Sequence, residues 1–266
     1  MDILKRTLAP VTDEAWAVID AQATRTLKGN LSARRLVDFS GPHGPHCAAV
    51  NLGLVKPGKA AAMRGVDWGI RQVQPLIEVR VPFTLELVSL DSVTRGNETP
   101  ELRELEAAAR LIALFEETAV YKGFAAAGMQ GILGAATGKP VALPTEPPAF
   151  VEAVEVGIAA LQGRGIGGPY ALALGRAPYL RMAAGDIGGY PLRRRIEELL
   201  GGGGIHWTPA LDAGVVLSTR KGDYELTVGQ DLAVGYQCHE EGRVGLFLME
   251  SFAFRVCEPA AAVAFV

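Results

Sequence analysis

The sequence lacks the residue patterns that usually mark an enzyme of its size. No GxSxG elbow, Walker loop, HExxH or EF-hand pattern occurs in its 266 residues. Only four histidines are present, and two of them, His43 and His46, lie in one loop. No nucleophile with a neighbouring base can be assigned, and the chain is therefore predicted not to be an enzyme.

Three further absences bear on partners and location. The formal net charge is −3 and the sequence pI is about 5.9, without the basic balance of a nucleic-acid binder. No apolar run reaches the ~18 residues that a membrane span needs, and no apolar segment follows the first charges as in a signal peptide. The three cysteines show no CxxC spacing, which predicts free, mostly buried thiols in a reducing compartment. We expect a cytoplasmic protein that binds neither nucleic acid nor membrane.

The residues that are present predict a globular α+β fold. Hydrophobic residues make up 49% of the chain and charged residues 21%. Apolar periodicity predicts helices over 10–29, 100–127, 149–162, 178–184 and 192–200. Strands are predicted over 170–174, 214–219, 223–228 and 243–256, and extended structure over 70–91, interrupted by Pro75 and Pro82 as on an edge strand. The order of these elements contains no regular βαβ units.

Residues 47–69 fit neither a helix nor a strand. They are rich in Ala and Gly, contain Pro57-Gly58, and show no clear period. Connections of this length in compact domains are usually functional or docked on another molecule. We interpret this segment as a long arm that packs on something other than its own core.

One glycine motif, 163–168, fits the GxGxxG pattern of dinucleotide-binding folds. Such a fold requires a strand, then the glycines, then a helix, because the helix N-terminus holds the pyrophosphate. Here a helix precedes the glycines, and Pro169 and a strand follow them. The order favours a helix end and a tight turn over nucleotide binding.

Three polar clusters each have a chemical and a simpler structural interpretation. His43, His46 and Cys47 have the types of metal ligands, but no second ligand cluster follows, and a surface loop is favoured. Glu116-Glu117 are adjacent on a helix and point about 100° apart, so solvated helix charges are favoured over an acid–base pair. Arginines 193–195 have the charge to bind an anion, but glutamates at 197 and 198 favour a self-paired helix surface or a subunit contact.

Seven short motifs in order give the chain a specific resemblance to one family. They are LKRTLAP at 4–10, RRLVD at 34–38, QPLIEVR at 74–80, GPYAL at 168–172, GYPL at 189–192, GQDLAVGY at 229–236 and ESFAF at 250–254. The sequence resembles the encapsulins of family 1, the linocin- or bacteriocin-type shell proteins of bacterial and archaeal nanocompartments. The resemblance extends over nearly the whole chain.

The resemblance implies the major capsid protein fold of tailed phages of the Hong Kong type. Its parts would be an N-terminal helix with the start of a peripheral domain (1–46), an extended loop (47–72), the peripheral domain with its spine helix (73–127), an axial domain (128–222) and the C-terminal strands of the peripheral domain (223–266). The arm inferred above fits the extended loop. Because an arm of this kind is stabilised by a neighbouring subunit, we expect an isolated subunit to fold poorly.

The same resemblance implies a site for cargo. Family members enclose enzymes such as ferritin-like proteins or dye-decolourising peroxidases, which serve iron storage and oxidative stress, through a C-terminal peptide on the cargo. The peptide would bind the inner face of the shell at Leu27, Leu31, Arg34, Arg35, Asp38, Asp231, Leu232, Val234 and Tyr236. An apolar groove with a charged rim suits such a peptide. An alternative is that these residues only form core and subunit contacts.

The family also implies a pore, and this sequence differs from some relatives at a flavin-binding position. The five-fold pore would be lined by Ala184, Gly185, Asp186, Ile187, Gly188, Gly189 and Tyr190, where a ring of Asp186 carboxylates would favour cations. Some relatives bind flavin through a tryptophan in the extended strand, but Val88 stands at that position. We therefore expect no flavin, and no other cofactor.

The resulting prediction is a shell subunit that assembles into an icosahedral nanocompartment, with 60 copies (T=1) as the expected size. One alternative is a phage or prophage head protein of the same fold. The other is an enzyme of the protease or bacteriocin type, which no nucleophile–base pair supports.

Overall fold

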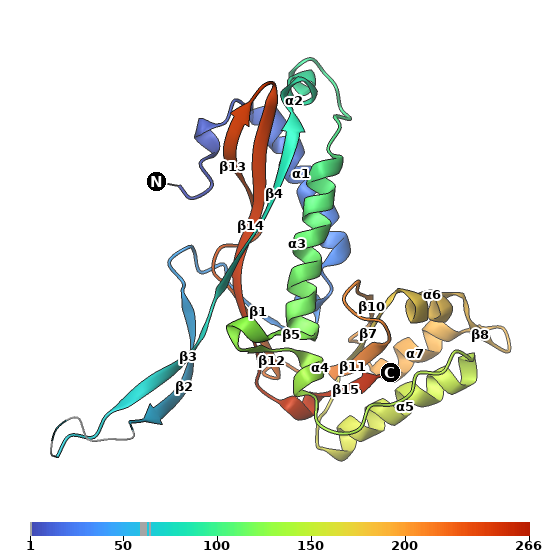
Figure 1. Ribbon diagram of the computed structural model, residues 1–266. Coiled ribbons are helices and arrows are strands. Elements are labelled where there is room, and N and C mark those ends of the chain that lie inside the picture. Colours follow the sequence, from blue (N-terminus) through green and yellow to red (C-terminus); the bar gives the residue numbers. More distant parts are fainter. Residues whose placement is uncertain (1, 59–62, 64) are drawn as a thin grey trace.

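The computed structural model describes residues 2–58, 63 and 65–266. Two lobes and a projecting arm are visible in Figure 1. The first lobe contains a five-stranded sheet along the long helices α1 and α3, and the second contains a four-stranded sheet with α5, α6 and α7. The arm, made of β2 and β3, extends away from both lobes.

The five-stranded sheet is organised around one long strand, β14 (Arg243–Val256). β13 (Ala233–Glu240) and β4 (Ile77–Glu86) pair antiparallel with its first part, and β12 (Tyr224–Val228) pairs with its last part. The short β1 (Asp38–Ser40) adds to β12 in parallel. β14 was predicted over the same residues, and β4 lies at an edge, where Pro82 costs no ladder hydrogen bond.

Helices α1 (Asp13–Asn30) and α3 (Arg103–Tyr121) cover this sheet. The Thr12 side chain accepts a hydrogen bond from the Ala15 N–H and caps α1, whose buried residues include Trp16 and Ile19. The helix predicted over 100–127 is shorter than expected, about 28 Å instead of roughly 40 Å at 1.5 Å per residue. It ends before Gly123, whose φ of +93° starts the short β5.

The extended structure predicted over 70–91 is wrong after residue 86. There β4 reaches the end of its partner, since Glu86 pairs with Arg243, the first residue of β14. The Leu87 N–H donates instead to the Gly242 carbonyl (2.8 Å), and the chain turns into helix α2 (Leu87–Thr94) with Leu90 buried. Val88, the position compared with the flavin-binding tryptophan, lies on this helix and is exposed.

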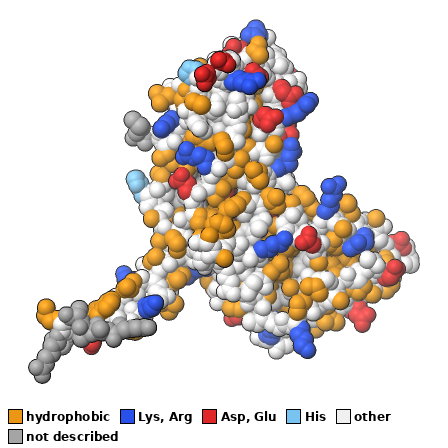
Figure 2. All heavy atoms as spheres, viewed as in Figure 1, with side chains coloured by type: hydrophobic (Ala, Val, Ile, Leu, Met, Phe, Trp, Pro, Cys, Tyr) orange, Lys and Arg blue, Asp and Glu red, His pale blue; other side chains and the backbone are white. Residues whose placement is uncertain are grey.

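The arm is a β-hairpin of β2 (Ala49–Pro57) and β3 (Gly69–Pro75). From residue 70 onward β3 lies within the predicted extended structure, whereas β2 was not predicted, because its side chains bury no consistent face. Large apolar side chains along it are exposed in this chain: Leu54, Val55, Met63, Val66, Trp68, Ile70 and Val73. Figure 2 shows hydrophobic side chains along the projecting arm.

The second lobe is built on the sheet order β10 (Ile205–Trp207), β7 (Tyr170–Leu174), β11 (Gly214–Ser218) and β15 (Ala262–Phe265). Helices α5 (Pro147–Gly163), α6 (Arg176–Ala184) and α7 (Leu192–Leu200) pack around it. The strands predicted over 214–219 and 223–228 exist but belong to different sheets. Within 223–266, the segment assigned to the C-terminal strands of the peripheral domain, β15 pairs with β11 of this second sheet.

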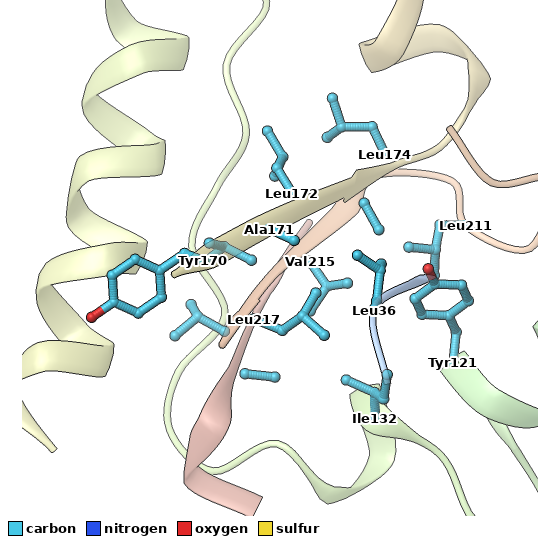
Figure 3. Close-up of a cluster of buried hydrophobic side chains, with 14 of the residues drawn as sticks. Leu36, Tyr121, Ile132, Tyr170, Ala171, Leu172, Leu174, Leu211, Val215 and Leu217 are labelled. Carbon is cyan, nitrogen blue, oxygen red and sulfur yellow. The ribbon is translucent and has the colours of Figure 1, made fainter. Parts of the chain in front are cut away.

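One hydrophobic core joins the two lobes. It contains β7 and β11 residues together with Leu36, Tyr121 and Ile132 from outside the second sheet. Figure 3 shows these side chains converging beside Val215. The remaining short elements are β5 (Gly123–Phe124), β6 (Met129–Gln130), α4 (Ile132–Ala135), β8 (Asp186–Ile187), β9 (Tyr190–Pro191) and the 3-10 turns η1 (Arg6–Leu8), η2 (Ala33–Arg35), η3 (Ala125–Ala127) and η4 (Pro259–Ala261).

Candidate functional site

A groove of about 280 Å³ lies between the second half of α1 and the start of β13. Three residues of the predicted cargo site line it: Leu27, Leu232 and Val234. Other lining residues come from the N-terminal segment, α1 and β14: Leu4, Arg6, Asp20, Ala23, Thr24, Ala233 and Leu248. The groove is therefore mostly apolar, with polar groups near one end.

The N-terminal segment forms one side of this groove, which the sequence analysis did not assign to the site. The Tyr236 N–H donates to the Leu4 carbonyl (2.8 Å), and the Arg6 Nε donates to the Val234 carbonyl (2.8 Å). Arg6 also pairs with Asp20 and lies over the Trp16 ring, 4.3 Å from its centroid. The motif LKRTLAP marked this segment as characteristic, but only the folded chain shows that it adjoins β13.

Leu27 and Leu31 are held by a continuous helix end. Although Gly29-Asn30 lie between them, α1 continues through Asn30, and the Leu31 N–H donates to the Leu27 carbonyl (3.0 Å). Both side chains are buried in the first-lobe core. Leu27 also borders the groove, whereas Leu31 borders a second hollow on the other side of the helix end.

Arg34 is the centre of a buried ion network. Its guanidinium contacts Glu116 at 2.5 Å, Asp231 at 2.8 Å and Glu250 at 3.1 Å. Both glutamates are fully buried, and Arg34 is 16% exposed at its side chain. Arg34 and Asp231, predicted as a free charged rim, thus neutralise each other and anchor the 229–232 turn to α3.

Three carboxylates face this single arginine. Burial alone would lower the pKa of Arg34, but its bonds to Glu116 and the charges of Glu116 and Glu250 together raise it. Burial, followed by the charge of Glu116, raises the pKa of Glu250 well above 4.5. Glu250 Oε1 has no hydrogen-bond partner among the described residues. Burial beside Glu116 therefore favours a protonated Glu250.

Glu116 and Glu117, predicted as solvated helix charges, are both buried. Glu117 accepts hydrogen bonds from the Ser32 N–H (2.8 Å), the Ser32 hydroxyl (2.5 Å), the Ala33 N–H (2.8 Å) and the Thr208 hydroxyl (2.7 Å). Burial raises its pKa, whereas these four donors favour the ionised form. The carboxylate thus fixes the turn after α1 and links it to the second lobe.

The remaining predicted residues are not gathered in the groove. Arg35 is exposed and donates to the Lys28 carbonyl (2.9 Å). The Asp38 carboxylate accepts from the Gly222 N–H (2.5 Å). Tyr236 is buried, with its hydroxyl 2.6 Å from His239 Nδ1. Arg35 and Asp38 both border a further hollow beside Ser218 and Tyr224, separate from the groove.

The predicted pore residues form the tip of the second lobe. After α6 ends at Ala184, β8 and β9 make a hairpin whose turn is Gly188-Gly189, both at positive φ. Asp186 Oδ1 accepts from the Gly189 N–H (3.0 Å) and tightens the turn. The Tyr190 hydroxyl donates to Glu198 (2.6 Å), which raises the Tyr190 pKa. Asp186, Ile187 and Tyr190 are exposed at this end, which Figure 1 shows beside α6 and α7.

The other motifs have structural roles. The glycines at 163–168 end α5 and turn into β7, as predicted. Arg193 pairs with Glu197 (2.8 Å), and Arg195 lies 3.9 Å from Glu198 and 3.8 Å from Glu155. Within the described residues, no group of three His, Cys, Asp or Glu side chains is placed to hold a metal ion. The cysteines are free, but Cys238 and Cys257 are exposed rather than buried, because they lie near the ends of β13 and β14.

The described helices are also too short or too polar to cross a bilayer.

Comparisons with known proteins agree on one family. The Linocin_M18 family model, described as "Encapsulating protein for peroxidase", matches residues 1–253. A type 1 encapsulin shell protein of Rhodospirillum rubrum is 41% identical, with 99% of this chain and 96% of the relative covered. The corresponding protein of Brevibacterium linens is 39% identical (96% and 95% covered), and that of Mycobacterium tuberculosis 37% (99% and 99%).

Solved structures show the fold. A virus-like particle from Pyrococcus furiosus matches with a TM-score of 0.67 at 15% identity, covering 93% of this chain and 98% of that one. The capsid of Myoviridae phage XM1 matches with a TM-score of 0.56 at 14% identity, covering 89% of each chain. The predicted α+β capsid fold is thereby confirmed. By sequence and by fold, this chain belongs to the encapsulin family of shell proteins.

Proposed function

We propose that this chain is a non-enzymatic subunit that assembles with copies of itself, 60 in a T=1 shell, into a cytoplasmic nanocompartment around cargo enzymes. The observation that carries the proposal is the β2–β3 arm. Leu54 is 59% exposed and Ile70 61% exposed on a two-stranded hairpin that leaves the body of the subunit. Isolated two-stranded hairpins are marginal in water, and soluble chains rarely expose such rows of apolar side chains.

A neighbouring subunit would cover these side chains. Identical subunits that meet through head-to-tail contacts form closed shells when the rotation closes. In this assembly the first lobe corresponds to the peripheral domain, the second lobe to the axial domain and the arm to the extended loop. The relatives are named as shell proteins, which supports this assignment.

Assembly is tested by negative-stain microscopy and size-exclusion chromatography of the purified protein. Uniform hollow particles are expected, and their diameter gives the copy number. The variant Leu54→Ser with Ile70→Ser should yield folded subunits that no longer assemble, while Val88→Ser, an equally exposed site on α2, should leave assembly intact. A wild-type chain that elutes as a monomer or dimer of about 28 kDa per chain would refute the proposal.

We further propose that the groove at Leu27, Leu232 and Val234 binds the apolar residues of a C-terminal peptide on the cargo, a ferritin-like protein or a peroxidase. Seven of its ten lining residues are apolar, and the other three, Arg6, Asp20 and Thr24, are polar. Such a groove suits alternating anchors of an extended peptide. The description of the family as encapsulating a peroxidase supports enclosed cargo.

Cargo binding is tested by co-expressing the shell with a fluorescent protein that carries a candidate cargo peptide. Leu232→Asp should abolish co-purification without changing particle size, because Leu232 is only partly buried. Asp38→Asn, at a predicted site residue outside the groove, should retain loading if the groove alone binds the peptide. Equal loading by wild type and Leu232→Asp would exclude the groove.

A further inference from the structure

A second hollow, of about 340 Å³, lies where the end of α1 meets the second lobe. Lys28 and Arg35 border it from the first lobe, and Tyr179, Arg193, His206 and Trp207 border it from α6, α7 and β10. It is distinct from the apolar groove, since no residue lines both. Any molecule bound here would contact both lobes.

The hollow carries an excess of positive charge. Lys28 and Arg35 form no ion pair with another described residue, and no carboxylate side chain is among the lining residues. Arg193 is held by Glu197 at 2.8 Å and therefore contributes less free charge. The carboxylate of Glu117 lies beneath Ser32, but its oxygens already accept four hydrogen bonds.

The histidine of the hollow is neutral rather than cationic. His206 Nε2 lies 3.1 Å from the Gly203 carbonyl, so this nitrogen carries the hydrogen and donates it there, and Nδ1 of the neutral ring carries a lone pair. Burial, and to a smaller extent Arg35, lowers the pKa of His206. Beside it, Tyr179 and Trp207 are half-buried and provide aromatic walls.

We propose that this hollow binds a phosphate-class oxyanion through Lys28 and Arg35, with the neutral ring of His206 and the side chains of Tyr179 and Trp207 as its walls. Flexible ammonium and guanidinium groups without competing carboxylates are the groups that bind phosphate most strongly in proteins. A volume of about 340 Å³ also accommodates the organic part of a small phosphate ester against Trp207, since ligand pockets begin near 300 Å³. Because both lobes line the hollow, a phosphate ester bound there would contact the end of α1 and β10 together.

The test uses assembled, cargo-free shells and equilibrium dialysis against radiolabelled inorganic phosphate at about 0.15 M ionic strength. We expect saturable binding of one anion per subunit. Lys28→Gln with Arg35→Gln should weaken binding about tenfold or more, whereas Arg25→Gln, which removes one positive charge elsewhere on α1, should not. Arg35→Lys, which keeps the charge, should retain most of the affinity, and negative-stain images verify that each variant assembles.

A competition experiment distinguishes the two sources of phosphate. Competition by adenosine monophosphate at lower concentration than inorganic phosphate would assign the site to a phosphate ester, and the reverse order would assign it to the free anion. The proposal fails if wild-type shells show no saturable binding. It also fails if the double glutamine variant binds as the wild type does, or if Arg25→Gln weakens binding equally.

Discussion

Replacing Glu250 by glutamine should stabilise the folded subunit at neutral pH, although the side chain is fully buried in an ion network. Arg34 faces Glu116, Asp231 and Glu250, so one positive charge is shared by three carboxylates. A glutamine amide can donate to Glu116 as a protonated Glu250 would, without requiring a proton from solvent. The substitution therefore imitates the form that burial already favours.

The sign of the pH dependence follows from the raised pKa of Glu250. The folded chain keeps a proton that the unfolded chain releases above its ordinary pKa of 4.5. The stabilisation from this proton is fully present below pH 4.5 and is lost as pH rises through the folded pKa, at about 1.4 kcal/mol per pH unit. Glu250→Gln has no such proton to lose. The free energy of unfolding of the variant minus that of wild type should therefore increase with pH by the same slope, between pH 4.5 and the raised pKa of the folded state.

Glu117→Gln is the matched comparison, since Glu117 is also a fully buried carboxylate. Four donors converge on its carboxylate, and an amide NH₂ would point hydrogens at one pair of them. Leaving buried donors unpaired costs about 1–3 kcal/mol each. The same chemical change should thus destabilise at residue 117 and stabilise at residue 250.

The assay is guanidinium unfolding followed by near-ultraviolet circular dichroism between pH 5 and 8, a range that begins just above the ordinary pKa of 4.5, where this slope starts. All variants are compared at one subunit concentration, because the stability of an oligomer depends on it. Parallel pH profiles for wild type and Glu250→Gln would refute a protonated Glu250. If Glu250→Gln lowered the free energy of unfolding as much as Glu117→Gln does, the inferred difference in hydrogen bonding at the two residues would be refuted.

Three further changes test other parts of the structure. Arg34→Ala should lower the free energy of unfolding by about 3–5 kcal/mol, because it leaves two buried carboxylates without their cation; adding Glu250→Gln should recover part of this loss. If the β8–β9 hairpin lines a five-fold pore as predicted, Asp186→Lys should slow metal-ion entry into shells loaded with an iron-storing enzyme. Unchanged uptake would contradict a cation-selective ring of Asp186 carboxylates. Gly41→Ala should lower the free energy of unfolding by about 2 kcal/mol or more, since φ at Gly41 is +136° and a Cβ there would lie 2.4 Å from the Val228 carbonyl oxygen. A thermal unfolding midpoint equal to that of wild type would contradict this.

Local patterns predicted the elements whose stability is decided within the segment itself. The Thr12 cap and the apolar period of α1 lie within one helix, and β14 alternates along its whole length. The order helix, glycines, strand at 163–174 was also predicted correctly, because Gly163 ends α5 before β7 begins. In each case neighbouring residues determine the conformation.

The misassigned residues depend on distant partners. In the sequence, Glu116 and Glu117 have the pattern of ordinary solvent-facing helix charges. Folding places Arg34, Ser32 and Thr208 against them, and these partners lie more than 80 residues away in the sequence. α2 likewise replaces a predicted strand because the partner of β4 ends at Arg243. Of the candidate cargo site, Leu27, Leu232 and Val234 could be placed together from motifs, whereas the internal pairing of Arg34 with Asp231 could not.

The arm differs from both classes, since its described apolar side chains, such as Leu54 and Ile70, are exposed in the single subunit. The two lobes share one core, which includes Tyr121 and Leu36. Against the expectation of a poorly folding isolated subunit, the lobes should therefore remain folded when subunits separate, and only the arm should depend on a neighbour. The β2–β3 hairpin is held by its own ladder of hydrogen bonds and, near its base, by the Gln74 side chain, which donates to the Ala127 carbonyl (2.9 Å). It should open readily once a neighbour no longer covers it. Hydrogen exchange measured by mass spectrometry should therefore show fast exchange at 49–57 and 69–75 in dissociated subunits and slow exchange in assembled particles, with β7 protected in both. Equal protection of the hairpin in the two states would mean that its stability does not depend on a second subunit.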